Sequence, residues 1–310
     1  MNLIHIRCLP LLLLVTLVRP ASGAERTLAV TFDDLPVAQS GAGACDFSAL
    51  PSFTEKLLRP FREQTIPLTA FVVSGNCPSL TLEQRRSVLR MWLEADAELG
   101  NHSHSHRSLN NTPLEEYQED ILRAEAELQA AVGPITLRYF RSPGLHTGAT
   151  PEAKQGLDQF LKAHGYVQAP VTIDNSEWVF ATVYGAAMTR GDDELAEKVR
   201  NAYIPYMESV VAFFEERTAE VVGREIPQVL LVHANSLNAD VAPELIAMFQ
   251  RRGYQFVSME EALRNPAFRL PDTYVGKVGL SWIHRLAITK GVPLKNEPEA
   301  PGWIMKELGN

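Results

Sequence analysis

The stretch TLAVTFDDLP (residues 27–36) joins a short apolar, β-branched run to two adjacent carboxylates. Such a run, followed by a turn signal, predicts a buried strand over residues 27–32. In parallel α/β folds, catalytic side chains gather at the carboxyl ends of strands, where Asp33 and Asp34 would lie. Because neighbouring side chains of an extended chain point to opposite sides, we expect one carboxylate to bind a cation and the other to face water or substrate. Taken alone, the pair is also compatible with an ordinary turn before Leu-Pro.

Similar runs recur along the chain and alternate with longer amphipathic segments, which is the pattern of βα units around a parallel sheet. The further candidate strands are residues 68–73, 136–140, 228–233 and 254–257, with a weaker one over residues 166–173. Thr81 and Gln84 fit a capping box, so a helix is predicted to begin at Thr81 and to end at Gly100. The sequence therefore predicts an α/β fold.

Three histidines occupy alternate positions in GNHSHSH (residues 100–106), directly after that predicted helix. On a strand all three side chains would share a face, whereas on a helical turn only His102 and His106 would lie together. We favour the turn, because two histidines four residues apart suit one zinc ion. One carboxylate would complete a three-ligand site with an open position for water. His104 is then expected to face solvent or to support the ligands.

The segment LRYFRSPGLHTG (residues 137–148) offers a positive charge and a tight turn. Arg141 is placed to hold the non-ligating carboxylate in its charged state through a bidentate pair. The backbone N–H of Gly144 is placed to face a substrate oxyanion. A plain Arg-Ser-Pro-Gly turn would explain the segment equally well.

A histidine closes the candidate strand QVLLVH at His233. It suits a general acid if a carboxylate fixes its tautomer and keeps it protonated. Asp174 or Glu177, both in the segment IDNSEW, could supply that carboxylate. Considered by itself, His233 is also compatible with a hydrogen-bonded core position.

Together, Asp-Asp, His-x-x-x-His, Arg-x-Pro, Asp-x-x-Glu-Trp and Leu-x-His follow one another along the chain. In kind and order they resemble the five motifs of the NodB-homology polysaccharide deacetylases, which form carbohydrate esterase family 4. The resemblance covers residues 27–263 and implies a distorted (β/α) barrel. It implies a catalytic domain over residues 25–265 and a C-terminal extension over residues 266–310, packed on or near the barrel.

The resemblance also assigns roles to single residues. It implies a metal, usually zinc but also another divalent ion such as Co²⁺ or Mn²⁺, bound by Asp34, His102 and His106. Asp33 would be the general base, and Arg141 would orient it. The histidine that ends the fifth motif would be the general acid.

Two departures from the family pattern concern the substrate side of the site. Where the family commonly has an aromatic residue and a glycine after the proline of its third motif, this chain has Gly144 and Leu145. Where the fourth motif commonly ends in Asp-Trp, this chain has Glu177 and Trp178. The support of the catalytic histidine is therefore open between Asp174 and Glu177. Gly144 and Trp178 are expected to line the substrate.

The activity implied by the resemblance is hydrolysis of N-acetyl or O-acetyl groups of a glycan, such as peptidoglycan or chitin, with release of acetate. A metal-dependent amidase or imide hydrolase acting on a small molecule could use the same ligands. A third hypothesis is that the protein is an inactive glycan-binding module that has kept the fold.

Residues 1–24 differ from the rest of the chain. Arg7 precedes an apolar run over residues 9–18, and small residues follow up to Ala24. This pattern predicts a cleaved signal peptide, because the apolar run is too short to span a bilayer. We expect a periplasmic or secreted protein without a membrane anchor.

The net charge of −8 at pH 7 comes without clusters of basic residues. An acidic surface argues against nucleic acid and anionic lipid as partners and leaves an acetylated glycan open. Oligomeric state has no signature in the sequence. Cys45 and Cys77 remain after removal of residues 1–24, and in an oxidising compartment they would form either a disulfide or two buried thiols.

Overall fold

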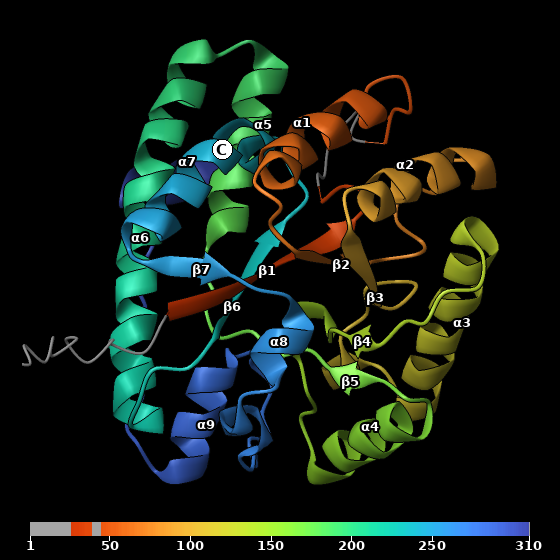
Figure 1. Ribbon diagram of the computed structural model, residues 1–310, viewed down its shortest axis with the longest axis vertical. Helices are drawn as coiled ribbons and strands as arrows, with labels where there is room; N and C mark the ends of the chain where they lie inside the picture. The colour runs from red at the N-terminus through yellow and green to blue at the C-terminus, as the bar shows by residue number, and fades with distance from the viewer. Residues whose placement is uncertain (1–25, 39–44, 310) are drawn as a thin grey trace, which may run out of the picture.

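Strand β1 (Arg26–Leu35) lies inside a parallel sheet in the computed structural model, which describes residues 26–38 and 45–309 (Figure 1). It pairs with β2 (Leu68–Val72) on one side and with β6 (Gln228–His233) on the other, while β7 (Tyr254–Phe256) pairs with its first residues. In the β1–β6 register Asp33 lies opposite His233. The pairing alone therefore brings two of the predicted catalytic residues together.

The sheet continues from β2 through β3 (Ala97–Asn101) and β4 (Tyr139–Phe140) to β5 (Val167–Gln168). A few residues after β5, Ile173 forms a parallel bridge with Leu230 of β6. The chain thus crosses from the last strand of the sheet to the strand at its other edge. This crossing curls the sheet into a distorted barrel and confirms the predicted α/β barrel class.

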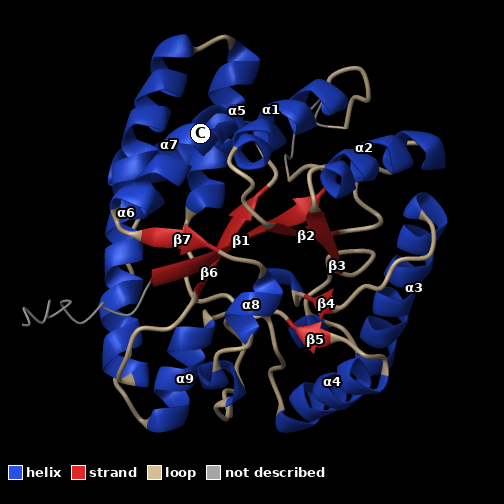
Figure 2. Ribbon diagram, in the orientation of Figure 1, coloured by secondary structure: helices blue, strands red, loops and turns tan. Residues whose placement is uncertain are grey.

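Helices surround the strands (Figure 2). They are α1 (Leu50–Glu63), α2 (Leu82–Glu94), α3 (Leu114–Val132), α4 (Pro151–Ala163), α5 (Glu177–Arg190), α6 (Asp193–Val222), α7 (Ser236–Arg251), α8 (Met259–Leu263), α9 (Trp282–Lys290) and α10 (Gly302–Leu308). Short 3₁₀ turns cover Leu109–Asn111, Pro143–Leu145 and Pro266–Arg269. Of the predicted C-terminal extension, α9 packs on α6 and α10 on α5. Across residues 26–38 and 45–309, no helix has the length and apolar character needed to cross a membrane.

Side chains of β1 alternate between two environments, as the period of a strand requires. Leu28, Val30 and Phe32 pack outward into the main core beneath the helices. Ala29 belongs to a smaller apolar cluster, which Met259 of α8 closes at one end of the barrel. Apolar packing thus fills one end of the barrel, and the polar residues lie at the carboxyl ends of the strands.

The predicted helix from Thr81 to Gly100 is partly wrong. The capping box at Thr81 is confirmed, but α2 ends at Glu94 and residues 97–101 form β3. Gly100 does not end a helix. A Cβ atom at this position would lie 2.5 Å from the ring of Phe71, so close packing between β3 and β2 requires the glycine.

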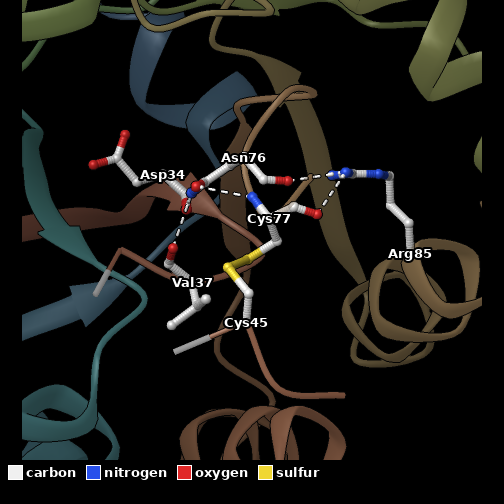
Figure 3. Close-up of a disulfide and its surroundings, with 6 residues drawn as sticks. All are labelled: Asp34, Val37, Cys45, Asn76, Cys77 and Arg85. Atoms are coloured by element: carbon white, nitrogen blue, oxygen red, sulfur yellow. Dashed lines mark hydrogen bonds between the residues drawn. A yellow bond between two sulfur atoms is a disulfide. The ribbon is translucent and has the colours of Figure 1, made fainter. Parts of the chain in front are cut away.

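A disulfide joins Cys45 to Cys77, with the two Cα atoms 5.2 Å apart (Figure 3). Next to Cys77, the side-chain amide of Asn76 donates to the backbone carbonyls of Asp34 (3.2 Å) and Val37 (2.9 Å). The cross-link therefore ties the loop after β2 to the segment that follows the Asp-Asp pair. The predicted signal peptide lies outside the described residues.

Candidate metal and catalytic site

Asp34, His102 and His106 form one cluster, in which the candidate ligand atoms all lie within 4.8 Å of one another. Asp34 Oδ1 is 3.5 Å from Nε2 of His102 and 3.2 Å from Nε2 of His106. Asp34 comes from the end of β1 and His102 directly follows β3. The three residues predicted as metal ligands are thus brought together by strands that flank β2.

The two histidines meet through an irregular turn, and the predicted helical turn is wrong. Ser103 and His106 adopt left-handed backbone conformations, with φ of 67° and 52°. The Asn101 side chain accepts from the Ser103 N–H (2.8 Å), and the Ser103 hydroxyl accepts from the His106 N–H (3.1 Å). These contacts fold the chain back on itself and place the two imidazole rings 5.0 Å apart.

The cluster has the properties that a divalent metal requires. Asp34 Oδ1 is buried and has no hydrogen bond of good geometry within the described residues. Nδ1 of His102 donates to the carbonyl of Arg141 (2.7 Å), which leaves the lone pair on Nε2 facing Asp34. Burial raises the pKa of Asp34, but the imidazoles of His106, His102 and His233 outweigh it and hold the pKa well below its usual range. One carboxylate and two imidazoles form a donor set that suits zinc.

Asp33 is held by a buried arginine. Its Oδ1 accepts a hydrogen bond from Arg141 (3.0 Å), while its Oδ2 faces Nε2 of His102 at 3.6 Å. The guanidinium is fully buried, lies over the ring of Phe71 (4.4 Å to the centroid) and donates to the carbonyl of Pro170 (3.3 Å). The pair is a single hydrogen bond, not the predicted bidentate one, because Nη2 donates to Pro170 and Nε has no partner among the described residues. One oxygen of Asp33 therefore remains directed at the metal cluster.

Glu177 is the carboxylate that supports His233. Its Oε2 lies 2.7 Å from Nδ1 of His233, and its Oε1 accepts from Asn235 and from Asn238. Burial lowers the pKa of His233, but the charge and hydrogen bond of Glu177, together with Asp34 and Asp33, raise it to about 9. Nε2 of His233, the nitrogen that Glu177 does not use, is 4.0 Å from Asp34 Oδ2. A histidine whose pKa is raised by Glu177 therefore faces the candidate metal cluster.

The remaining predicted site residues are Asp174, Gly144 and Trp178. Asp174 accepts from the N–H of Asn175 (2.9 Å) and does not take the position beside His233. Burial and the charge of Glu297 raise the pKa of Asp174 to about 7. Gly144 lies in the turn Pro143–Leu145 with φ of 60°, a conformation that glycine adopts without strain. Trp178 follows Glu177 and is 53% exposed.

His104 has partners that the sequence did not reveal. Its Nδ1 lies 2.9 Å from Oε2 of Glu127 on α3 and 3.0 Å from the hydroxyl of Ser74. With Asp34 and His106 it also lines a cavity of about 520 Å³. His104 thus ties the histidine segment to α3. Only the tertiary structure identifies Glu127, because it lies on a helix far along the chain.

Replacing His104 by alanine is expected to leave metal binding intact and to lower stability by about 1 kcal/mol, since the hydrogen bonds to Glu127 and Ser74 are lost. His102→Ala is expected to abolish metal binding. Elemental analysis after zinc loading, combined with denaturant unfolding, measures both effects, with the exposed His164→Ala as control. Loss of the metal from His104→Ala would show that this histidine is a ligand.

Residues 21–167 match the family model described as polysaccharide deacetylase. Among solved structures, two mutants of a Bacillus anthracis pseudoenzyme of carbohydrate esterase family 4 share 15% identity with this chain. Each match covers 77% of this chain and 68% of the pseudoenzyme chain, with TM-scores of 0.52 and 0.51. The second of these mutants has restored enzymatic activity. Peptidoglycan deacetylase PdaC from Bacillus subtilis shares 19% identity over 79% of this chain and 95% of its own, with a TM-score of 0.48.

At such identities the likeness to solved structures concerns the fold alone. The two pseudoenzyme mutants extend that likeness over 77% of this chain. The match of residues 21–167 relates this part of the chain to the polysaccharide deacetylase family.

Proposed function

We propose that this protein is a metal-dependent carbohydrate deacetylase that hydrolyses N-acetyl groups, or alternatively O-acetyl groups, of a glycan such as peptidoglycan or chitin. One observation carries the proposal. A three-residue metal cluster, a carboxylate fixed by a buried arginine and a histidine of raised pKa lie at the same end of the barrel. A glycan-binding module without activity would not need the last two.

In the proposed reaction the chain's own residues handle the protons. A zinc ion or another divalent metal held by Asp34, His102 and His106 would polarise the acetyl carbonyl and lower the pKa of a water. The free oxygen of Asp33 takes the proton from the attacking water, and Arg141 keeps that carboxylate charged. The protonated His233 then donates to the departing amine. Each acid or base step contributes a rate factor of roughly 10² to 10⁴.

Together with the metal, the backbone N–H of Gly144 is proposed to stabilise the oxyanion that forms from the acetyl carbonyl. The turn that carries Gly144 is covered by the C-terminal segment. A Cβ atom on Gly279 would lie 1.7 Å from the Gly144 carbonyl oxygen, so the two backbones are in direct contact. We propose that this contact narrows the substrate groove beside Gly144, which favours, as a second candidate, a small-amide or imide hydrolase.

Replacing Asp33 by asparagine is expected to reduce acetate release by roughly 10²- to 10⁴-fold and to leave the metal bound, because Asp33 is not a ligand in the proposed site. Acetate release is measured on chitooligosaccharides, peptidoglycan fragments and acetylated xylan, side by side with small amides and imides. Asp96→Asn, an exposed change, is the control. Near-normal turnover by Asp33→Asn would contradict its role as base, and turnover of small amides alone would favour the second candidate.

The pH dependence tests the Glu177–His233 pair. His233 donates its proton only when protonated, so kcat/KM is expected to fall as the pH rises through about 9, the raised pKa of His233. In Glu177→Gln the main charge that raises this pKa is gone, and the alkaline limb is expected to move to lower pH. Rate profiles from pH 6 to 10 measure the shift, with Glu152→Gln as an exposed control. An unmoved limb in a folded variant would exclude His233 as the acid.

We also propose that the protein is exported to the periplasm or secreted, with residues 1–24 as a cleaved signal peptide. The Cys45–Cys77 disulfide supports this location, because disulfides persist mainly in oxidising compartments. Cell fractionation with thiol labelling is expected to find the full chain outside the cytoplasm with both thiols blocked. Deletion of residues 2–24 should leave it in the cytoplasm. Cytoplasmic retention of the full chain would overturn the proposal.

A further inference from the structure

A second cavity, of about 470 Å³, lies beside the Glu177–His233 pair. Its walls come from the start of α5, the start of α9, and the segment of residues 294–300 with Met305 of α10. Ser176 and Trp178 line it, and Glu177 between them holds His233. All of its lining residues lie outside residues 21–167, the part of the chain that matches the family model. The cavity is thus specific to the later part of the chain.

Large apolar side chains remain in water around this cavity. Trp178, Leu294 and Met305 are 53%, 50% and 49% exposed. They come from different parts of the chain and line the same cavity. Exposed apolar groups that surround a cavity with a few polar atoms are typical of a ligand site.

The polar atoms of the cavity are acidic. Glu297 is about one-third exposed, and its Oε1 lies 3.1 Å from Nδ1 of the buried His284. Glu299 is exposed, whereas the ammonium of Lys295 is paired with Glu220 at 2.8 Å. The available charge in the cavity is therefore negative.

We propose that this cavity binds a neighbouring sugar unit of the glycan and favours an amino sugar with a free ammonium group. The inference rests on the proposed function. An exposed indole supplies a flat face for the apolar side of a pyranose ring, and a carboxylate accepts from sugar hydroxyls or from an ammonium. Deacetylation itself produces such a unit. A partly deacetylated chain would thus be held next to the catalytic centre, whereas an anionic sugar would be repelled.

Electrostatics connect the cavity to the catalytic centre. Asp174 responds to the charge of Glu297 on the cavity side and to those of His233 and His284. Its pKa, raised to about 7 by burial and by Glu297, would fall when a cation neutralises Glu297. Occupation of the cavity by a cation is therefore expected to favour the charged form of Asp174.

Isothermal titration of zinc-loaded protein with glucosamine tetramer, which has no acetyl group, tests binding without turnover. Glu297→Gln and Trp178→Ala are each expected to weaken binding roughly tenfold, the size of one charge-assisted hydrogen bond or one stacking contact. Salt should weaken binding by the wild type and have much less effect on Glu297→Gln. Met188→Ala, at the other end of α5 and 48% exposed, and Glu63→Gln, an exposed carboxylate on α1, are the controls and should bind as the wild type does.

Unchanged affinity in both cavity variants, or equal loss in the controls, would overturn this inference. Rates on tetramers that carry one glucosamine unit, relative to fully acetylated ones, give a second readout. The wild type is expected to prefer the former, and Glu297→Gln is expected to lose that preference. Absence of acetate release from every glycan would instead refute the proposed function, and the titration would still report on the cavity.

Discussion

The buried ion pair between Asp33 and Arg141 is the contact on which the rest of the site depends. Arg141 lies fully inside the barrel, where a guanidinium without a counter-charge would be strongly destabilising. Asp33 supplies that charge, and the ring of Phe71 and the carbonyl of Pro170 take up other parts of the group. The backbone carbonyl of Arg141 also accepts from His102. A single residue therefore orients both the proposed base and one proposed metal ligand.

The backbone directs the side chains of the adjacent Asp33 and Asp34 to different partners. Asp33 stays in register with β6, opposite His233, and its side chain points into the barrel toward Arg141. Asp34 lies where the register of β1 with β2 shifts, and its φ is 66°, so its side chain turns toward the histidines that follow β3. The disulfide and Asn76 hold the segment that follows. Strand pairing fixes the position of Asp33, and the irregularity at the end of β1 fixes that of Asp34.

In the Glu177–His233 pair, one carboxylate also serves several groups. Glu177 uses one oxygen on His233 and the other on Asn235 and Asn238, so the buried carboxylate is fully hydrogen-bonded. Such satisfaction keeps the pair rigid in a low-dielectric interior. The cavity lined by Trp178 and Glu297 begins at the next residue along the chain. In this protein the proposed sugar site and the support of the proposed acid are thus built on one helix start.

The sequence by itself predicted the described strands other than β3, the strand-end position of Asp33, Asp34 and His233, and the pairing of His102 with His106 as candidate metal ligands. Those features follow from local patterns of apolar residues and from spacing. Only the tertiary structure decided that residues 97–101 form a strand, because Ala, Glu and Leu favour a helix locally and the pairing with β2 overrides them. It also chose Glu177 over Asp174 and gave His104 its partners, since both depend on residues distant in the chain. Side-chain contacts between distant segments leave no periodic signal, and only packing brings them together.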